Sequence, residues 1–427
     1  MQTLLPTLTL ALVCWLASAP LVAAEIDAAA AQGQQRIAAQ AYRDEDLMGY
    51  TRALEAAVAL NPNSLVTRYN LACGYARTGR PEQAMDMLRE LAAVSADYGM
   101  ADDEDLASLR EREDFQQLVN DLKKGTQPVS TATHAFTLQQ LGLIPEGIAL
   151  HQPSGRFFIG SMRSGDIFVV DAEGQLSKFA TVQHAGKMAA IGLMVDEKRG
   201  LLWAVGSTFS LVEDYDPEAE ARSGVFGFDL SSGELREHYL GTNTINGFND
   251  VALSPSGDIY LSGDAVSVVR KGSAEITPID TSIKIFGSNG IAVRPDGKRM
   301  FVSSYPVGIA SIDPASGAAR WLDTPADVSL YGVDGLYWHK GFLIAVQNGM
   351  QPWRLVKLQL NADQTAVTAA HLIEFATEEV TPTTGAIRGD TIYYVGSGPS
   401  PENLPSQLPK SIAGFSGKTI VMSAPLN

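Results

Sequence analysis

The sequence is poor in cysteine, with Cys14 and Cys73 as its two in 427 residues. Cys14 lies in the first 24 residues, which carry no charged side chain, hold a largely apolar stretch from Leu8 to Leu16, and end in small residues. This pattern predicts a secretory signal peptide over residues 1–24, although the lack of an early Lys or Arg leaves a retained membrane anchor as an alternative. The mature chain would keep Cys73 alone, which excludes an intramolecular disulfide and argues against a cysteine-based metal site.

Basic residues are outnumbered: 32 Lys and Arg stand against 48 Asp and Glu, which gives a formal net charge of −16. Because proteins bind nucleic acid through basic surfaces, this balance argues against a nucleic-acid partner. After the signal peptide, no run reaches the ~20 apolar residues that a membrane span requires. We therefore expect a secreted, periplasmic protein with no membrane contact once the signal is removed.

Several catalytic signatures are also missing. The sequence has no G-x-S-x-G nucleophile elbow, no P-loop, no dinucleotide-binding fingerprint and no H-E-x-x-H zinc motif. The hydrophobic content of 45% is nevertheless enough for a large buried core. The indications of function must therefore come from the way the chain is organised.

A phrase repeated six times fills the C-terminal two-thirds of the chain. Each copy is a short apolar run, a turn with glycine, and a second run rich in β-branched and aromatic residues, which predicts two antiparallel strands. One glycine position recurs at intervals of 40 to 58 residues, and it is occupied by Gly147, Gly192, Asp250, Gly290, Gly335 and Gly385. That period leaves room for about four short strands and predicts a six-bladed β-propeller, so the protein should be mainly β.

The N-terminal part of the sequence has a different hydrophobic periodicity. From about Ile26 to Leu122, apolar residues recur three and four positions apart, which predicts amphipathic helices. Tetratricopeptide spacing is met by Leu71, Ala72, Tyr75, Gly79, Ala84 and Leu88. We expect a tetratricopeptide-like helical domain at 25–125, a linker at 126–134 and the propeller at 135–427. The helices could bind a protein partner or could only cap the propeller.

The residue before the recurring glycine is the candidate functional position. It is occupied in turn by Glu146, Ile191, Asn249, Asn289, Asp334 and Thr384. The innermost strands of a propeller surround its central channel, so equivalent positions on them form a ring. Two carboxylates and two amide oxygens in that ring would suit Ca²⁺ or another hard divalent cation. For any one of these residues, a simpler role as a turn former remains open.

At these residues the sequence resembles the calcium-dependent six-bladed propellers that include gluconolactonase and senescence marker protein, and more distantly the paraoxonases. The shared phrases are PEG at Pro145, FND at Phe248, SNG at Ser288 and VDG at Val333, in the family's order. The resemblance covers roughly residues 135 to 425.

The resemblance implies that Glu146, Asn289 and Asp334 bind Ca²⁺ and that Asn249 is either a further ligand or a substrate contact. It also implies hydrolysis of a small lactone or ester, in which the metal polarises the carbonyl group. Asp334 is our candidate for the base that accepts a proton from the attacking water. Asp250 could orient Asn249, and His184, in the loop that enters the second blade, could overhang the channel mouth.

Three departures from the family pattern bear on the substrate. Ile191 stands where paraoxonases carry a histidine, Gly247 where sugar lactonases often carry an arginine, and Gly335 where paraoxonases carry an asparagine. These differences favour a fairly apolar lactone or ester over an acidic or polyhydroxylated one. The alternative function is a non-catalytic scaffold, in which the metal is structural and the helical domain recruits a protein.

Overall fold

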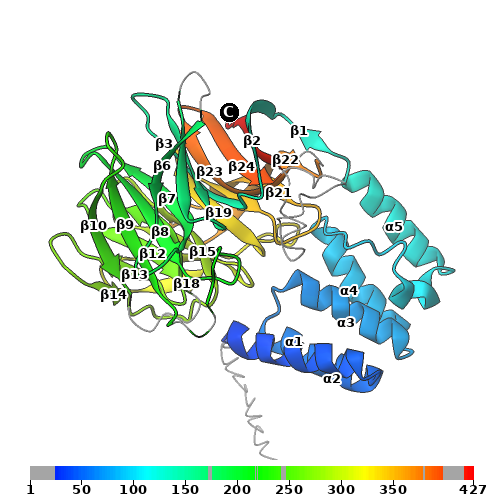
Figure 1. The fold of residues 1–427 in the computed structure, drawn as a ribbon. Coiled ribbons are helices and arrows are strands. Elements are labelled where there is room, and N and C mark those ends of the chain that lie inside the picture. Colours follow the sequence, from blue (N-terminus) through cyan, green and yellow to red (C-terminus); the bar gives the residue numbers. More distant parts are fainter. Residues whose placement is uncertain are drawn as a thin grey trace, which may run out of the picture.

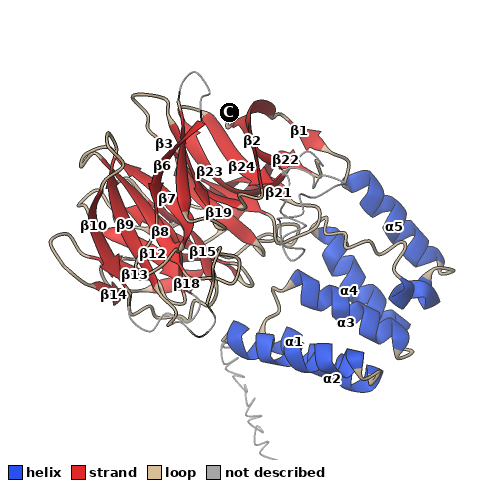
Figure 2. Cartoon of the chain, viewed as in Figure 1, coloured by secondary structure: helices blue, strands red, loops and turns tan. Residues whose placement is uncertain are grey.

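A computed structural model describes residues 25–427 except 172–175, 217, 219, 242–246, 378–379 and 398–417. The predicted signal peptide, residues 1–24, therefore lies outside the described residues. The described chain folds into an N-terminal helical region and a six-bladed β-propeller, as Figures 1 and 2 show. No helix in this part of the chain is long and apolar enough to cross a membrane.

The helical region lies beside one side of the propeller (Figure 2). Its helices are α1 (Ala28–Arg43), α2 (Leu47–Leu60), α3 (Leu65–Arg77), α4 (Pro81–Ala93), the 3₁₀ helix η1 (Glu104–Leu109) and α5 (Glu113–Gly125). The side chains of Asp27 and Asp46 cap the first two helices by accepting from Ala30 N and Gly49 N. Helices α1 and α2 pack as one pair, and α3 and α4 as another. Their identity as tetratricopeptide repeats stays a prediction.

The first four blades are each a four-stranded antiparallel sheet built from consecutive strands. Blade 1 consists of β3 (Pro145–Leu150), β4 (Phe157–Ser161), β5 (Asp166–Val170) and β6 (Leu176–Thr181). Blade 2 consists of β7 (Ala189–Asp196), β8 (Leu201–Ser207), β9 (Ser223–Asp229) and β10 (Leu235–Leu240). Blade 3 consists of β11 (Phe248–Leu253), β12 (Ile259–Gly263), β13 (Ser267–Val269) and β14 (Ile276–Pro278). Blade 4 consists of β15 (Ser288–Val293), β16 (Met300–Ser304), β17 (Gly308–Ile312) and β18 (Ala319–Trp321).

The last two blades join segments that are far apart in the sequence. Blade 5 consists of β19 (Val333–His339), β20 (Phe342–Gln347), β21 (Arg354–Leu360), β22 (Val367–Phe375) and the added edge strand β1 (Val129–Ser130). Blade 6 consists of β23 (Thr381–Arg388), β24 (Thr391–Ser397), β25 (Lys418–Pro425) and β2 (Thr133–Leu141). Pairing of β2 with the C-terminal β25 closes the ring of blades. Two residues of the expected linker, Val129 and Ser130, are thus paired with blade 5.

The propeller core lies between neighbouring blades. Phe158 of blade 1, for example, is buried in one cluster with Leu202 and Phe226 of blade 2. Side chains alternate between the two faces of each sheet, so every blade buries apolar residues against both of its neighbours.

A register irregularity occurs near the start of all six innermost strands. On β3, Pro145 pairs with Ser161 and Ile148 pairs with Ile159, so Glu146 and Gly147 lie opposite a single residue of β4. An extra residue of this kind is a β-bulge, which turns a side chain away from its regular direction. The position that was singled out in the sequence therefore lies on a bulge in blades 1 to 5, whereas in blade 6 the irregularity precedes Thr384, which pairs with Val395.

The glycine that follows each bulge position allows the innermost strands to approach closely. A Cβ atom on Gly147 would overlap the carbonyl oxygen of Ile191 in the next blade, and would lie 3.0 Å from Leu193 Cγ. A Cβ atom on Gly290 would lie 2.5 Å from Leu336 N. The repeated glycines are therefore explained by packing around the channel.

We expect Gly147→Ala to destabilise the protein by about 2 kcal/mol or more, because the added methyl group meets backbone atoms that cannot move aside. Gly125→Ala is a suitable control, since a Cβ atom at the end of α5 would meet nothing within 4 Å. Thermal and urea denaturation of the two variants measure the difference. Equal stability of both would contradict this account of the ring.

Candidate metal centre

The structure brings the predicted ring residues to the start of four innermost strands. Glu146 lies on β3, Asn249 on β11, Asn289 on β15 and Asp334 on β19, each as the second residue of its strand. Asp334 is buried, with 5% of its surface exposed, and the other three are partly buried. Blades 1, 3, 4 and 5 therefore each carry one oxygen-bearing residue at the same position of the innermost strand.

Three acidic residues around the channel influence one another. Burial raises the pKa of Glu146 well above its usual value, and the charges of Asp334 and Asp250 raise it further. Burial also raises the pKa of Asp334 to about 7, an effect partly offset by the amides of Asn348 and Asn289. No salt bridge within the described chain joins a Lys or Arg to any of these three acids. Buried carboxylates without a cation are costly, and a bound metal ion would remove that cost.

Two oxygen atoms in this cluster have no hydrogen-bond partner although they are buried. They are Oδ1 of Asn289 and Oδ1 of Asp334. The second oxygen of Asp334, Oδ2, accepts a hydrogen bond from Asn348 Nδ2 at 2.5 Å. Unpaired buried oxygens are rare in folded proteins and call for a specific explanation. A shared cation would supply one, because both atoms could serve as its ligands.

Asp250 occupies the position that holds glycine in the other blades. Its Oδ1 accepts from its neighbour Val251 N at 2.8 Å, and its Oδ2 accepts from Ile291 N of blade 4 at 3.3 Å. Burial raises its pKa to about 7 in spite of these bonds. Asp250 therefore links the innermost strands of blades 3 and 4. Its predicted role, which is to orient Asn249, stays a prediction.

The two remaining ring positions do not add a metal ligand of the predicted kind. Ile191 is buried, with 1% of its surface exposed. The hydroxyl groups of Thr383 and Thr384 both donate to the carbonyl oxygen of Glu146. Blade 6 thus holds the backbone of the first blade at the ring position.

His184 lies away from the channel centre. Its ring faces that of His238 on β10, the outermost strand of blade 2, with 5.6 Å between the ring centroids. Adjacent strands in a sheet are about 4.8 Å apart, so three such spacings separate the outermost strand from the innermost one. This placement does not favour the predicted role of His184 at the channel mouth.

Asn348 and Tyr305 are functional candidates that the sequence analysis missed. Asn348 Nδ2 donates to Asp334 Oδ2 and also to the carbonyl oxygen of Pro382 at 2.9 Å, while Asn348 Oδ1 accepts from Tyr305 Oη at 2.9 Å. Both residues follow the second strand of their blade: Asn348 is the last residue of the fifth copy of the repeated phrase, and Tyr305 comes directly after the fourth copy. No spacing signal in the sequence marks these positions.

The possible ligands at this centre are a mixture of carboxylate and amide oxygens, which suits a calcium ion, and do not form a compact cluster of carboxylates. Glu146, Asp250 and Asp334 do not form a group whose carboxylate oxygens all lie within 4.8 Å of one another, as far as the described residues show. A cation would therefore be bound by Glu146 and Asp334 together with amide and backbone oxygens. Such mixed oxygen ligands are typical of Ca²⁺, which takes six to eight of them.

One compact group of possible ligands does occur in the described chain, at Cys73, Asp103 and Asp105 of the helical region. Asp103 accepts hydrogen bonds from Tyr69 Oη at 2.7 Å and from Cys73 Sγ at 3.8 Å, and Asp105 pairs with Arg77. Burial raises the pKa of Cys73, so its thiol keeps its proton. These contacts account for the group without a metal ion.

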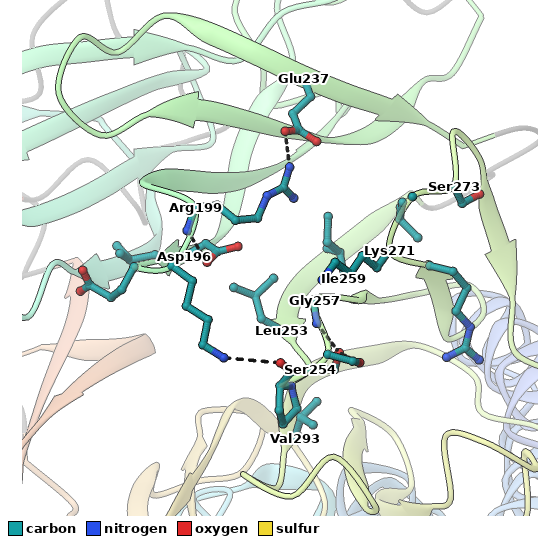
Figure 3. Close-up of a pocket in the computed structure, with 18 of the residues that line it drawn as sticks. Asp196, Arg199, Glu237, Leu253, Ser254, Gly257, Ile259, Lys271, Ser273 and Val293 are labelled. Carbon is teal, nitrogen blue, oxygen red and sulfur yellow. Dashed lines mark hydrogen bonds and ion pairs between the residues drawn. The ribbon is translucent and has the colours of Figure 1, made fainter.

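A small cavity of about 190 Å³ lies inside the ring of innermost strands. Asp250, Tyr337 and Thr384 are among the residues that line it. A larger groove, of about 1040 Å³, lies elsewhere, at the hairpin turns of blades 2, 3 and 4. Figure 3 shows its labelled walls, including Arg199 paired with Glu237, and Lys271. The four ring residues do not line this groove.

No protein-family model and no curated protein matches this chain. Among solved structures, it is similar to a gluconolactonase from Xanthomonas campestris, with 14% identity, 68% of this chain and 89% of that chain covered, and a TM-score of 0.46. It is also similar to regucalcin, a calcium-binding protein from Agrobacterium tumefaciens, with 16% identity, coverage of 69% and 96%, and a TM-score of 0.46. A virginiamycin B lyase from Staphylococcus aureus has 13% identity, coverage of 69% and 98%, and a TM-score of 0.42.

We expect the stability of the metal-free protein to fall as the pH rises through about 4 to 7, because Asp334 and Asp250 have pKa values near 7 when folded and near 4 when unfolded. The folded state then binds more protons than the unfolded state, so each rise in pH disfavours folding. Saturating Ca²⁺ should remove most of this loss, since the cation takes the place of the protons.

Thermal melting between about pH 5 and pH 8, with Ca²⁺ or with a chelator, measures this effect. The variant Asp334→Asn, which cannot titrate at this position, should show a flatter pH profile without metal. A metal-free protein that becomes more stable toward pH 8 would contradict the sign of the prediction.

Proposed function

We propose that this protein is a secreted, Ca²⁺-dependent hydrolase of a small, fairly apolar lactone or ester. The observation that carries the proposal is the cluster of buried oxygen-bearing residues on the innermost strands, in which Asn289 Oδ1 and Asp334 Oδ1 have no hydrogen-bond partner. Glu146, Asn289 and Asp334 would hold the cation, and Asn249 would complete its ligands or contact the substrate.

A bound Ca²⁺ would polarise the substrate carbonyl and stabilise the negative charge that develops on its oxygen. Asp334 would act as the base that removes a proton from the attacking water. Its Oδ2 accepts a hydrogen bond from Asn348, so Oδ1, which would also contact the cation, is the atom left to accept the proton through its second lone pair. A positive charge nearby keeps a carboxyl group ionised, so Asp334 would be in the form that the base requires.

The shape of the site supports a substrate without acidic groups. Gly247, which stands where sugar lactonases often carry an arginine, has a φ angle of +78°, a conformation that disfavours any larger residue. A Cβ atom there would also lie 2.6 Å from Ser207 Oγ. The backbone thus has no room for an arginine at this position, and Ile191 presents an apolar side chain in place of a proton-relaying histidine.

A second candidate function is a scaffold that binds another protein through its helical domain. The observation that favours it is the exposure of apolar side chains on the first two helices: Ile37 is 56% exposed, Met48 53% and Tyr42 43%. A groove of about 500 Å³ lies between α1, α2 and α3 beside them. In that case the metal would only stabilise the propeller.

We expect the purified protein to hydrolyse members of a panel of uncharged lactones and aryl esters when Ca²⁺ is present, and to lose this activity with a chelator. Asp334→Asn should lower kcat at least 100-fold, because both a ligand charge and the base are removed. Asp363→Asn is the matched control, since Asp363 lies on an exposed turn. A calcium-loaded protein that turns over no member of the panel would favour the scaffold.

Secretion has its own test. When the full sequence is produced in a Gram-negative host, we expect periplasmic protein whose N-terminus lies near Glu25, because the signal peptide is removed after the small residues that precede it. N-terminal sequencing or intact mass measurement checks this. Retention of residues 1–24 in a membrane fraction would instead support an anchor.

A further inference from the structure

Asn348 holds Asp334 from a loop that the helical domain in turn holds in place. The loop joins β20 to β21, and the segment 348–354 consists of this loop and Arg354, the first residue of β21. At its start, the Asn348 amide donates to Asp334 Oδ2 at 2.5 Å. At its other end, the Arg354 guanidinium donates to the carbonyl oxygens of Val94 and Ser95, at 3.0 and 2.9 Å. One short segment thus joins the end of α4 to the ring.

The middle of the same loop is also docked on the helical domain. Asp97 N donates to the carbonyl oxygen of Gln351 at 2.7 Å. Met350, which is fully buried, belongs to the same apolar cluster as Leu88 and Leu91 of α4. The loop therefore cannot move without breaking contacts with the helices.

A second connection reaches Asn348 through Tyr305. The Tyr305 hydroxyl donates to Asn348 Oδ1 and thereby fixes which way the amide group faces. The two residues after Tyr305 are bound by the helical domain: Asn61 Nδ2 donates to Pro306 O at 2.8 Å, and Asn63 Nδ2 donates to Val307 O at 3.0 Å. The Asn348 side chain thus has three hydrogen-bond partners. Asp334 and Pro382 O belong to blades 5 and 6, and Tyr305 is followed directly by two residues that the helical domain binds.

We propose that Asn348 is a positioning residue of the metal centre, and that docking of the helical domain sets the affinity of the ring for Ca²⁺ by fixing the loop 348–354 and the turn 305–307. This inference rests on the proposed function, which assigns the ring as the calcium site. The helical domain would then supply no metal ligand itself. It would affect the site through the contacts that hold these two propeller segments in place.

The physical reason is the cost of ordering a ligand. Without Asn348, Asp334 has no described hydrogen-bond donor on Oδ2 and can rotate, so the cation would have to immobilise it on binding. Residues that hold metal ligands in this way typically contribute 10- to 100-fold to metal affinity. Because coupling between two binding events is reciprocal, bound Ca²⁺ should also strengthen the docking of the helices.

Calorimetric titration of the full-length, metal-free protein with Ca²⁺ tests the first step. We expect Asn348→Ala to weaken Ca²⁺ binding at least 10-fold, and Asn348→Ser, which keeps a small donor, to recover part of that loss. Asp334→Asn should abolish binding at this site. Melting temperatures in excess Ca²⁺ verify that each variant is folded.

The effect of helical-domain docking on Ca²⁺ affinity is tested by changing residues of the helical domain. The double variant Asn61→Ala with Asn63→Ala changes no propeller residue, and it should weaken Ca²⁺ binding about fivefold, the lower end of typical coupling between sites. Asn120→Ala, on the exposed side of α5, is the matched control and should bind as the unmodified protein does. Ca²⁺ should also slow hydrogen–deuterium exchange of the segment 94–98 in the unmodified protein.

The outcomes separate the two proposals. Unchanged affinity in Asn348→Ala, while Asp334→Asn loses binding, would overturn the positioning role and leave the hydrolase proposal intact. Unchanged affinity in the Asn61 and Asn63 double variant would overturn the part assigned to the helical domain. Calcium affinity that depends on Asn348 in a protein that hydrolyses no lactone or ester would overturn the hydrolase proposal alone.

Discussion

The arrangement of this protein depends on an electrostatic constraint at the centre of the propeller. Burial disfavours the charges of Glu146, Asp250 and Asp334, and the charge of Asp334 raises the pKa values of the other two further. The propeller core packs with neutral apolar side chains between the blades, so these acids are not needed to form the blades. Such a cluster is stable in its charged form only with a cation among its oxygens, and two unpaired buried oxygens indicate where that cation would bind.

The fold provides this cluster by repeating one local device. A β-bulge at the second or third residue of each innermost strand turns a side chain toward the channel, and a glycine beside it lets the next strand come close. In blade 3 the glycine is replaced by Asp250, whose carboxylate bridges to Ile291 N of blade 4. The same backbone geometry therefore serves packing in some blades and chemistry in others, depending on the side chain it presents.

The helical region is linked to this centre more closely than its separate fold suggests. Its contacts with the propeller include hydrogen bonds from the side chains of Asn61 and Asn63 and from Asp97 N. They also include the hydrogen bonds that Arg354 donates to Val94 O and Ser95 O, and the packing of Met350 against α4. They fall on the loop and the turn that carry Asn348 and Tyr305. A domain that was considered either a partner-binding module or a cap is thus also placed to influence the ring.

The six-fold repeat was sufficient to predict the blades and their order, because a strand and its neighbour across a tight turn are encoded within about 20 residues. Glu146, Asn289 and Asp334 could be aligned for the same reason: they hold equivalent places in successive copies. The sequence also predicted the helices from their periodicity, but not the β1 strand of two residues, which exists only because blade 5 offers it an edge.

The sequence by itself determined a propeller of six blades, preceded by helices, with oxygen-bearing side chains at one register position. Only the tertiary structure decided that His184 lies beside an outer strand, that Asp250 bridges two blades, and that Asn348 holds Asp334. The reason is physical: periodicity reports the direction in which a side chain points within its own element. Contacts between loops of different blades, and between the helices and those loops, depend on how whole elements pack, and no local pattern in the sequence records that packing.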